Sequence, residues 1–241
     1  MGGRPRPPRP GMPLPTSSEI AERAATLRRR LDAAAEAAGR DPARVRIVAV
    51  TKTWPATVCR AAHDAGLTML GENRVQEALP KVTAVPEATW HLVGHLQSNK
   101  VRPAVGAFDW IHAVDSPALL RRIEAQAHDA GRAPRLLLQV NVTDEPQKAG
   151  FDPDALGDAE LLAAIAELRR STLVGLMTIA RQGADPRPAF ARLRALRDEL
   201  EQRAGIGLAE LSMGMSADVV EAVREGATLV RIGTALFGTR G

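Results

Sequence analysis

The sequence predicts an α/β protein, a single (β/α)8 TIM barrel with an extra N-terminal helix. Short apolar runs alternate with amphipathic helical patterns along the 241 residues. Eight such runs occur over about 220 residues, which is the number and length typical of this barrel. The turn after the first run has no glycine-rich fingerprint, which argues against the main rival, an open doubly wound sheet that binds a dinucleotide.

The chain is expected to begin with a disordered tail. Residues 1–15 are rich in proline, glycine and arginine and offer little to a hydrophobic core. The barrel domain is then expected over 16–241. Thr16 and Glu19 have the spacing of a capping box, and apolar residues recur at helical intervals until Gly39. This pattern predicts the extra helix, over 16–38, before the first strand.

The remaining elements follow from the same patterns in chain order. We expect strands at 47–52, 67–70, 90–93, 110–114, 136–142, 173–179, 208–213 and 228–232. We expect helices at 55–65, 75–82, 116–131, 153–170, 186–200 and 216–225.

Composition excludes several classes of protein. Hydrophobic residues make up 45% of the chain, enough for a large core. A single cysteine, Cys59, excludes an internal disulfide and fits a cytoplasmic location. No apolar run approaches membrane-spanning length, and no secretory signal is expected. The formal charge of +4 falls to +1 without the three arginines of the tail, so no nucleic-acid partner is predicted.

Lys52 ends the first apolar strand. By alternation it shares a face with Val48 and Val50, and Pro55 follows at the start of a helix. Ligands of α/β barrels bind at the C-terminal ends of the strands. A partly dehydrated lysine there has a lowered pKa and can attack a carbonyl to form a Schiff base. The alternative is a lysine whose stem packs on the strand while its ammonium reaches water.

Two segments near the C-terminus look suited to an anion. Gly214 and Ser216 lie where the seventh strand turns into a helix, and Gly233 and Thr234 follow the eighth strand. Backbone N–H groups and a hydroxyl at these loops commonly bind phosphate in such barrels. Taken singly, Ser216 could be a plain N-cap and Gly233 a plain turn residue. Their occurrence at adjacent strand ends favours a phosphate site.

Arg231 lies on the eighth strand, on the same face as Leu229 and Gly233. Its guanidinium is expected to point into the mouth of the barrel. It could donate a hydrogen bond to a ring nitrogen there. Alternatively it could form an ion pair with Asp218 or Glu221.

Six motifs together carry a family resemblance. They are Val50-Thr51-Lys52, Gly71-Glu72-Asn73, Leu96-Gln97-Ser98-Asn99-Lys100, Gly175-Leu176-Met177, Ser212-Met213-Gly214-Met215-Ser216 and Val230-Arg231-Ile232-Gly233-Thr234-Ala235. In this order they resemble the YggS/PROSC-type pyridoxal 5′-phosphate homeostasis proteins, relatives of the N-terminal barrel of alanine racemase. The resemblance covers nearly all of residues 17–241.

The resemblance implies pyridoxal 5′-phosphate (PLP) as the cofactor. Lys52 resembles the lysine that holds PLP as a Schiff base. Ser216, with the backbone of Gly233 and Thr234, resembles the phosphate cradle, and Arg231 resembles the arginine that faces the pyridine nitrogen. Asn73 resembles a residue at the mouth of the cofactor site, and Met213 and Met177 are expected near the ring.

The resemblance also implies a carrier without efficient turnover. Alanine racemase uses a tyrosine from a separate C-terminal domain as its second acid/base, and this chain has no tyrosine. We therefore expect a protein that binds PLP and delivers it to apoenzymes. That domain also supplies the racemase's main dimer surface, so a monomer is expected. A weak amino-acid racemase and a cofactor-free Schiff-base aldolase are the alternatives.

Other polar residues are weaker candidates. His91 and His95 have no partners at metal-ligand spacing, so no metal site is predicted. Lys148 resembles a loop residue of the family, and a solvated lysine is the simpler interpretation. Cys59 is expected to pack on a helix.

Overall fold

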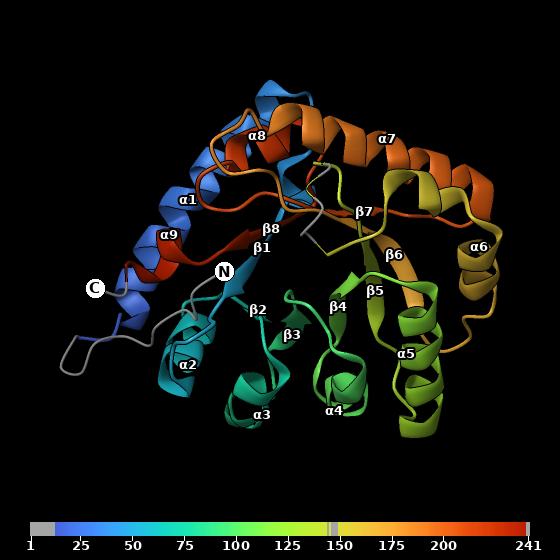
Figure 1. Ribbon diagram of the computed structural model, residues 1–241. Coiled ribbons are helices and arrows are strands. Elements are labelled where there is room, and N and C mark those ends of the chain that lie inside the picture. Colours follow the sequence, from blue (N-terminus) through green and yellow to red (C-terminus); the bar gives the residue numbers. More distant parts are fainter. Residues whose placement is uncertain (1–12, 144, 146–148, 240–241) are drawn as a thin grey trace.

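The computed structural model describes residues 13–143, 145 and 149–239. Eight parallel strands close into a barrel in chain order, surrounded by helices (Figure 1). The strands are β1 (Arg46–Val50), β2 (Met69–Glu72), β3 (Thr89–Leu92), β4 (Trp110–Val114), β5 (Arg135–Gln139), β6 (Thr172–Met177), β7 (Glu210–Ser212) and β8 (Leu229–Ile232). The α-helices are α1 (Ser17–Ala37), α2 (Ala56–Asp64), α3 (Val75–Ala84), α4 (Val101–Ala107), α5 (Pro117–Ala130), α6 (Ala159–Ala166), α7 (Arg187–Ala204), α8 (Val219–Arg224) and α9 (Thr234–Phe237).

The predicted barrel and its extra N-terminal helix are confirmed. The capping box at the start of α1 is complete, because Thr16 Oγ1 accepts from the Glu19 N–H and Glu19 Oε2 accepts from the Thr16 N–H. The apolar face of α1 packs beside α2, α8 and α9, which closes the ring of helices next to β1 (Figure 1). The predicted tail lies mostly outside the described residues, so its disorder stays a prediction.

Several boundaries differ from the predictions. Helix α4 was not expected. Pro103 and Gly106, both poor helix formers, lie inside it, but its buried side chains pack into the core between the strands and the helices. Strand β5 ends at Gln139 instead of residue 142. The expected helix from 216 to 225 begins only at Val219, after a turn in which the Met215 N–H donates to Asp218 Oδ1 at 2.6 Å.

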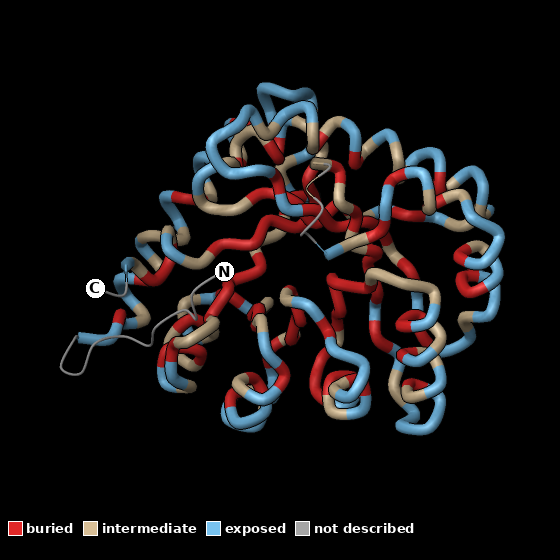
Figure 2. Tube along the Cα trace, viewed as in Figure 1, coloured by how far each residue is buried: buried red, intermediate tan, exposed pale blue. Residues whose placement is uncertain are grey.

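The core has two layers that follow the alternation of each strand. Inside the barrel, a small cluster contains Val48, Val50, Trp110, Met177 and Leu229, among others. The larger cluster fills the space between the strands and the helices, and includes the alternate positions of the same strands. Figure 2 shows this arrangement, with buried strands at the centre and exposed outer helix faces. The predicted inward face of β1 is therefore confirmed.

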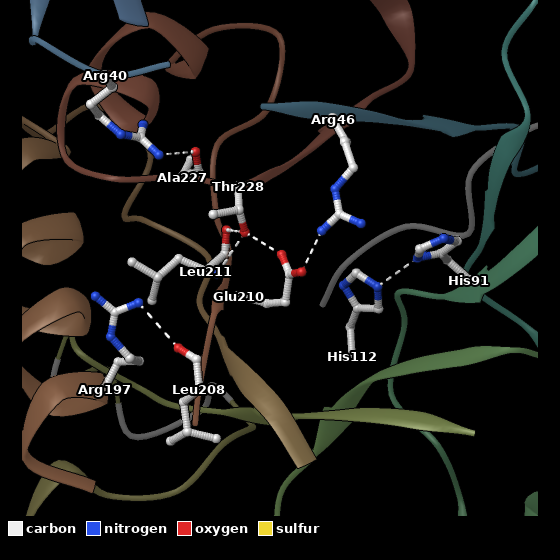
Figure 3. Close-up of polar contacts among 10 residues, drawn as sticks. All are labelled: Arg40, Arg46, His91, His112, Arg197, Leu208, Glu210, Leu211, Ala227 and Thr228. Carbon is white, nitrogen blue, oxygen red and sulfur yellow. Dashed lines mark hydrogen bonds and ion pairs between the residues drawn. The ribbon is translucent and has the colours of Figure 1, made fainter. Parts of the chain in front are cut away.

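The N-terminal end of the barrel is closed by polar and aromatic side chains. Arg46 on β1 pairs with Glu210 on β7, and Thr228 donates to Glu210 Oε2 (Figure 3). The guanidiniums of Arg46 and Arg135 lie 5.6 and 5.0 Å from the Trp110 ring centroid, within cation–π range. These contacts fill the N-terminal end of the barrel, away from the end where ligands of such barrels bind.

No helix in the described part of the chain is long and apolar enough to cross a bilayer.

Candidate functional site

A pocket of about 300 Å³ opens at the C-terminal end of the barrel. It brings together six of the seven residues predicted for the site, which come from β1, β2, β7 and β8 and the loops that follow them. They are Lys52, Asn73, Ser216, Arg231, Gly233 and Thr234. Apolar side chains complete the wall: Val50, Val93, Ile179, Met215 and Ala217, together with the polar Gln182.

Lys52 lies at one side of this pocket, two residues beyond the end of β1 and half-buried. Alternation along β1 directs Val48 and Val50 into the barrel, and Lys52 continues that face as predicted. The turn after the strand is tight, because the Trp54 N–H donates to the Thr51 carbonyl at 3.0 Å. The amine is thus carried by a fixed backbone and not by a long loop.

The part of the pocket formed by the loops after β7 and β8 carries hydrogen-bonding groups suited to an anion. The Ala235 N–H in the short helix α9 donates to Ser216 Oγ at 3.4 Å, which brings the loops after β7 and β8 together. Gly233 and Thr234 begin α9, where backbone N–H groups lack helical acceptors. Ser216 was expected to lie at the start of the helix that follows it. Helix α8 begins three residues later, at Val219, and Ser216 contacts α9 instead.

Gly214 makes this arrangement possible. Its φ of +91° lies in the region that glycine favours, and a Cβ there would come within 2.5 Å of the Ala222 Cβ. The tight turn lets the Gly214 carbonyl accept the Arg231 N–H at 3.0 Å. The loop that carries Ser216 is therefore tied to β8.

Arg231 forms the floor of the pocket and is buried. Its Nη1 donates to the carbonyl and to Oγ of Ser212, each at 2.8 Å, and Nη2 donates to the Thr178 carbonyl at 2.9 Å. These bonds use three of the five guanidinium N–H groups. Burial lowers the pKa of Arg231 to about 10, while Asp218 raises it, so the group stays charged at neutral pH.

No carboxylate within the described residues forms an ion pair with Arg231, although Asp218 and Glu221 lie on the adjacent segment. The alternative of a structural ion pair is therefore not what the structure shows. The guanidinium is held by neutral oxygens, and these bonds leave two of its N–H groups without an acceptor among the described residues.

A chain of buried side chains continues from Arg231 into the barrel. Ser212 Oγ lies 2.8 Å from His112 Nδ1, and His112 Nε2 lies 2.9 Å from His91 Nδ1. The His91 ring stacks on Trp110, with centroids 5.1 Å apart, and Figure 3 shows the two histidines in contact. Burial lowers the pKa of His91 to about 3 and that of His112 well below 6.5, so both are neutral.

The donor pattern of this chain is set by the guanidinium, which can only donate. Ser212 Oγ accepts from Arg231, and its own proton is then directed to His112 Nδ1. His112 in turn donates from Nε2 to His91 Nδ1. This leaves the His91 Nε2–H as the end of the chain, consistent with its lack of a partner among the described residues. Sequence reasoning placed Ser212 in a motif without giving it a role, and it did not single out His112.

Met213 does not reach the pocket. It is completely buried in the layer between the barrel and the helices, because Ser212 occupies the inward position and strand alternation turns the next side chain outward. Met215, two residues later, lines the pocket in its place. Met177 belongs to the cluster inside the barrel and does not line the pocket, so its expected place near the ring stays a prediction.

The weaker candidates lie elsewhere. His95 Nδ1, on an exposed side chain, lies 3.2 Å from Asp115 Oδ2, and neither residue lines the pocket. Cys59 is buried on α2, where burial raises the pKa of its thiol. Lys148 lies outside the described residues. No group of three potential metal ligands occurs among the described residues.

A larger hollow, of about 540 Å³, adjoins the pocket between the β6–α7 loop and α8. It shares Gln182, Met215 and Ala217 with the pocket, and six of its thirteen lining residues are charged. Only the smaller pocket combines an amine, anion donors and a buried cation, so it is the candidate site.

Comparison with known proteins places the chain in a family. Residues 23–241 match the model of the alanine racemase N-terminal domain. Pyridoxal phosphate homeostasis proteins of Pseudomonas aeruginosa and Aquifex aeolicus are 46% and 41% identical to this chain, over 92% and 91% of it and 96% and 97% of their own lengths. The chain belongs to the pyridoxal phosphate homeostasis protein family. The resemblance inferred from the six motifs is therefore confirmed.

Solved structures agree with this family. PipY of Synechococcus elongatus, in a structure with PLP bound, is 46% identical with a TM-score of 0.79, over 91% of this chain and all of that chain. An alanine racemase of Clostridium difficile has a TM-score of 0.70 at 14% identity. That likeness covers 59% of the racemase and shows a shared fold.

Proposed function

We propose that this protein binds PLP at the barrel mouth, holds it on Lys52 and passes it to acceptor apoenzymes without efficient turnover. The observation that carries the proposal is the single pocket that joins Lys52, Ser216 with the start of α9, and Arg231. The PLP-bound structure of the 46% identical PipY and the names of the curated relatives support it.

The residues present fit the three polar parts of PLP. Ser216 and the backbone of Gly233 and Thr234 would receive the phosphate, in a cradle where a Cβ on Gly233 would approach the Val50 carbonyl at 3.4 Å. Arg231 would donate to the pyridine nitrogen from its free N–H groups. Asn73 lies at the rim, with its backbone packed against Gly94 so closely that a Cβ there would clash.

When bound, PLP supplies an aldehyde that condenses with a primary amine to a Schiff base and releases water. Lys52 would provide that amine. Arg231 remains charged, so it disfavours protonation of the pyridine nitrogen and makes the ring a weaker electron sink than a carboxylate partner would. This arrangement suits storage better than the stabilisation of a carbanion.

The described lining of the pocket offers no second group for proton transfer. Its described lining residues include no carboxylate, histidine or cysteine, and the sequence has no tyrosine. Racemisation needs two positioned acid/base groups on opposite faces of the cofactor. We therefore expect the protein to deliver PLP, with another amine taking the place of Lys52 on the cofactor. We also propose that the protein is a cytoplasmic monomer.

Borohydride reduction of the PLP-treated protein, followed by peptide mapping, tests the proposal. The pyridoxyl group is expected on Lys52 and is expected to be lost in Lys52→Ala. Lys100→Ala, a lysine outside the pocket lining, is the matched control. Label on another lysine alone would contradict the proposal.

Solvent-deuterium exchange at the α-carbon of added amino acids separates the carrier from the alternative, a weak racemase. The carrier predicts slow exchange, no faster than with PLP and a simple amine. Exchange at enzyme-like rates, of about 1 s⁻¹ or more, would favour the racemase.

A further inference from the structure

The turn that carries Lys52 has an unusual backbone. The Trp54 N–H donates to the Thr51 carbonyl, so Lys52 and Thr53 are the two central residues of a four-residue turn. Thr53 has a φ of +67°. It is the only non-glycine residue with a positive φ among the described residues. A positive φ at the third position alone is the pattern of a type II turn, which favours glycine there. For a β-branched residue this conformation is strained.

Three buried groups hold the start of this turn in place. Thr51 Oγ1 donates to Glu72 Oε1 at 2.6 Å. Lys81 on α3 donates from Nζ to the same carboxylate oxygen at 2.7 Å and to the Thr51 carbonyl at 3.0 Å. The Thr51 carbonyl thus accepts both the closing bond of the turn and the ammonium of Lys81. A helix outside the barrel is connected through this cation to the residue that precedes Lys52.

These features oppose stability locally. Burial raises the pKa of Glu72 despite its contact with Lys81, and Glu72 Oε2 has no partner among the described residues. Thr53 Oγ1 is likewise buried without a hydrogen-bond partner among the described residues. Buried ion pairs are commonly no more stable than apolar replacements, because the loss of hydration offsets the attraction. Backbone strain of this kind is found where a function requires it.

We propose that Thr53, Lys81 and Glu72 are positioning residues for Lys52. Lys81 and Glu72 hold the turn in a conformation that the β-branched Thr53 disfavours, so that the Lys52 amine stays directed into the pocket. The inference rests on the proposed function, because it assigns Lys52 the attack on the cofactor aldehyde. An amine fixed near the carbonyl reacts faster than a mobile one, since less motion must be frozen in the transition state.

The first test replaces Thr53 by glycine. Thr53→Gly is expected to raise the melting temperature, because glycine adopts positive φ without strain. It is also expected to slow the capture of PLP by Lys52, measured by stopped-flow absorbance, by about threefold or more. Thr68→Gly, at an exposed threonine with negative φ, is the matched control and is expected to lower the melting temperature and leave the rate unchanged.

The second test removes the ion pair as a unit. The double variant Lys81→Met/Glu72→Met leaves no lone buried charge, so it is expected to fold. Capture of PLP is expected to slow by about tenfold. The equilibrium affinity for pyridoxine 5′-phosphate, which has no aldehyde, is expected to stay unchanged, because the phosphate and ring contacts are intact. A loss of that affinity equal to the loss in rate would indicate general damage to the site and would overturn the proposal.

A cofactor-free readout separates this proposal from the proposed function. Competitive acetylation of Lys52 across a pH series reports how accessible and how basic its amine is. Positioning predicts that both variants change the acetylation rate of Lys52 relative to Lys100. If the parent protein captures no PLP on Lys52, the proposed function fails and acetylation alone decides the role of the turn. Parental rates of acetylation and capture in both variants would overturn the proposal.

Discussion

Two buried cations lie close to the candidate site and are compensated in opposite ways. Lys81 lies outside the barrel wall and pairs with the carboxylate of Glu72 at 2.7 Å. Arg231 lies inside the barrel and, among the described residues, donates to two carbonyls and a hydroxyl. The Lys81 pair has no net charge, whereas the charge of Arg231 is left for whatever occupies the pocket.

This difference separates a positioning charge from a binding charge. Opposite charges at close range cancel each other's field at a distance, so the Lys81–Glu72 pair affects mainly the turn it touches. Neutral partners hold a guanidinium in place without cancelling its charge. The histidines behind Ser212 fit this role only while they are uncharged, since an imidazolium next to Arg231 would repel it.

The largest effect on stability is expected from removing only the lysine of the Lys81–Glu72 ion pair. Lys81→Met leaves the Glu72 carboxylate buried without a cation and is expected to cost about 3–5 kcal/mol of unfolding free energy. Urea denaturation measures the loss. The double variant with Glu72→Met is the control and is expected to restore stability to near the parental value. Similar losses in both would show that the charges are not coupled.

The neutral histidines predict a steep dependence of stability on pH. Their folded pKa values lie below the unfolded value of 6.5, so the unfolded state binds more protons as the pH falls. Their contribution is present above pH 6.5 and is lost below it, at about 1.4 kcal/mol per pH unit for each fully responding histidine. Denaturation series between about pH 6 and pH 4 measure the slope.

A variant sharpens the same measurement. His91→Phe keeps an aromatic ring against Trp110. It is expected to reduce the slope of stability against pH by the contribution of one histidine. An unchanged slope would mean that His91 is not the neutral group described above.

Removing the hydroxyl between Arg231 and His112 has a smaller expected effect. Ser212→Ala leaves one guanidinium N–H and His112 Nδ1 without their partner, which is expected to cost about 1–3 kcal/mol. Ser18→Ala, on the exposed face of α1, is the control and is expected to change stability by less than about 0.5 kcal/mol. Equal stabilities of the two variants in urea would remove Ser212 from the chain.

The smallest effect is expected at the pair of His95 and Asp115, in which the histidine is exposed. His95→Ala is expected to change stability by less than about 1 kcal/mol, since exposed ion pairs contribute little. Capture of PLP, followed by absorbance, is expected to stay at the parental rate. A marked loss would give this pair a role at the barrel mouth.

The sequence predicted the parts of the site that follow from alternation along a strand. Val48, Val50 and Lys52 share a face in any regular strand, and the same holds for Leu229, Arg231 and Gly233. Met213 was misplaced because a methionine near a predicted site suggests a contact, whereas alternation from Ser212 turns it outward.

The supporting groups could not be predicted because they depend on contacts across the barrel. His112 and Ser212 are 100 residues apart, and neither belongs to a pattern that signals the other. Lys81 was read as part of an amphipathic helix, and only the packing of α3 against β1 and β2 brings its ammonium to Thr51. The positive φ of Thr53 runs against the preference of its residue type.

The contrast between the two cations is tested most directly by titration with pyridoxine 5′-phosphate, which reports the noncovalent contacts alone. Arg231→Met is expected to raise Kd by roughly tenfold or more, because a hydrogen bond from a charged donor contributes about 1.5–3 kcal/mol. Arg231→Lys, which keeps the charge, is expected to lie between Arg231→Met and the parent. The Lys81→Met/Glu72→Met variant is expected to bind like the parent. Parental affinity in a folded Arg231→Met protein would contradict the account.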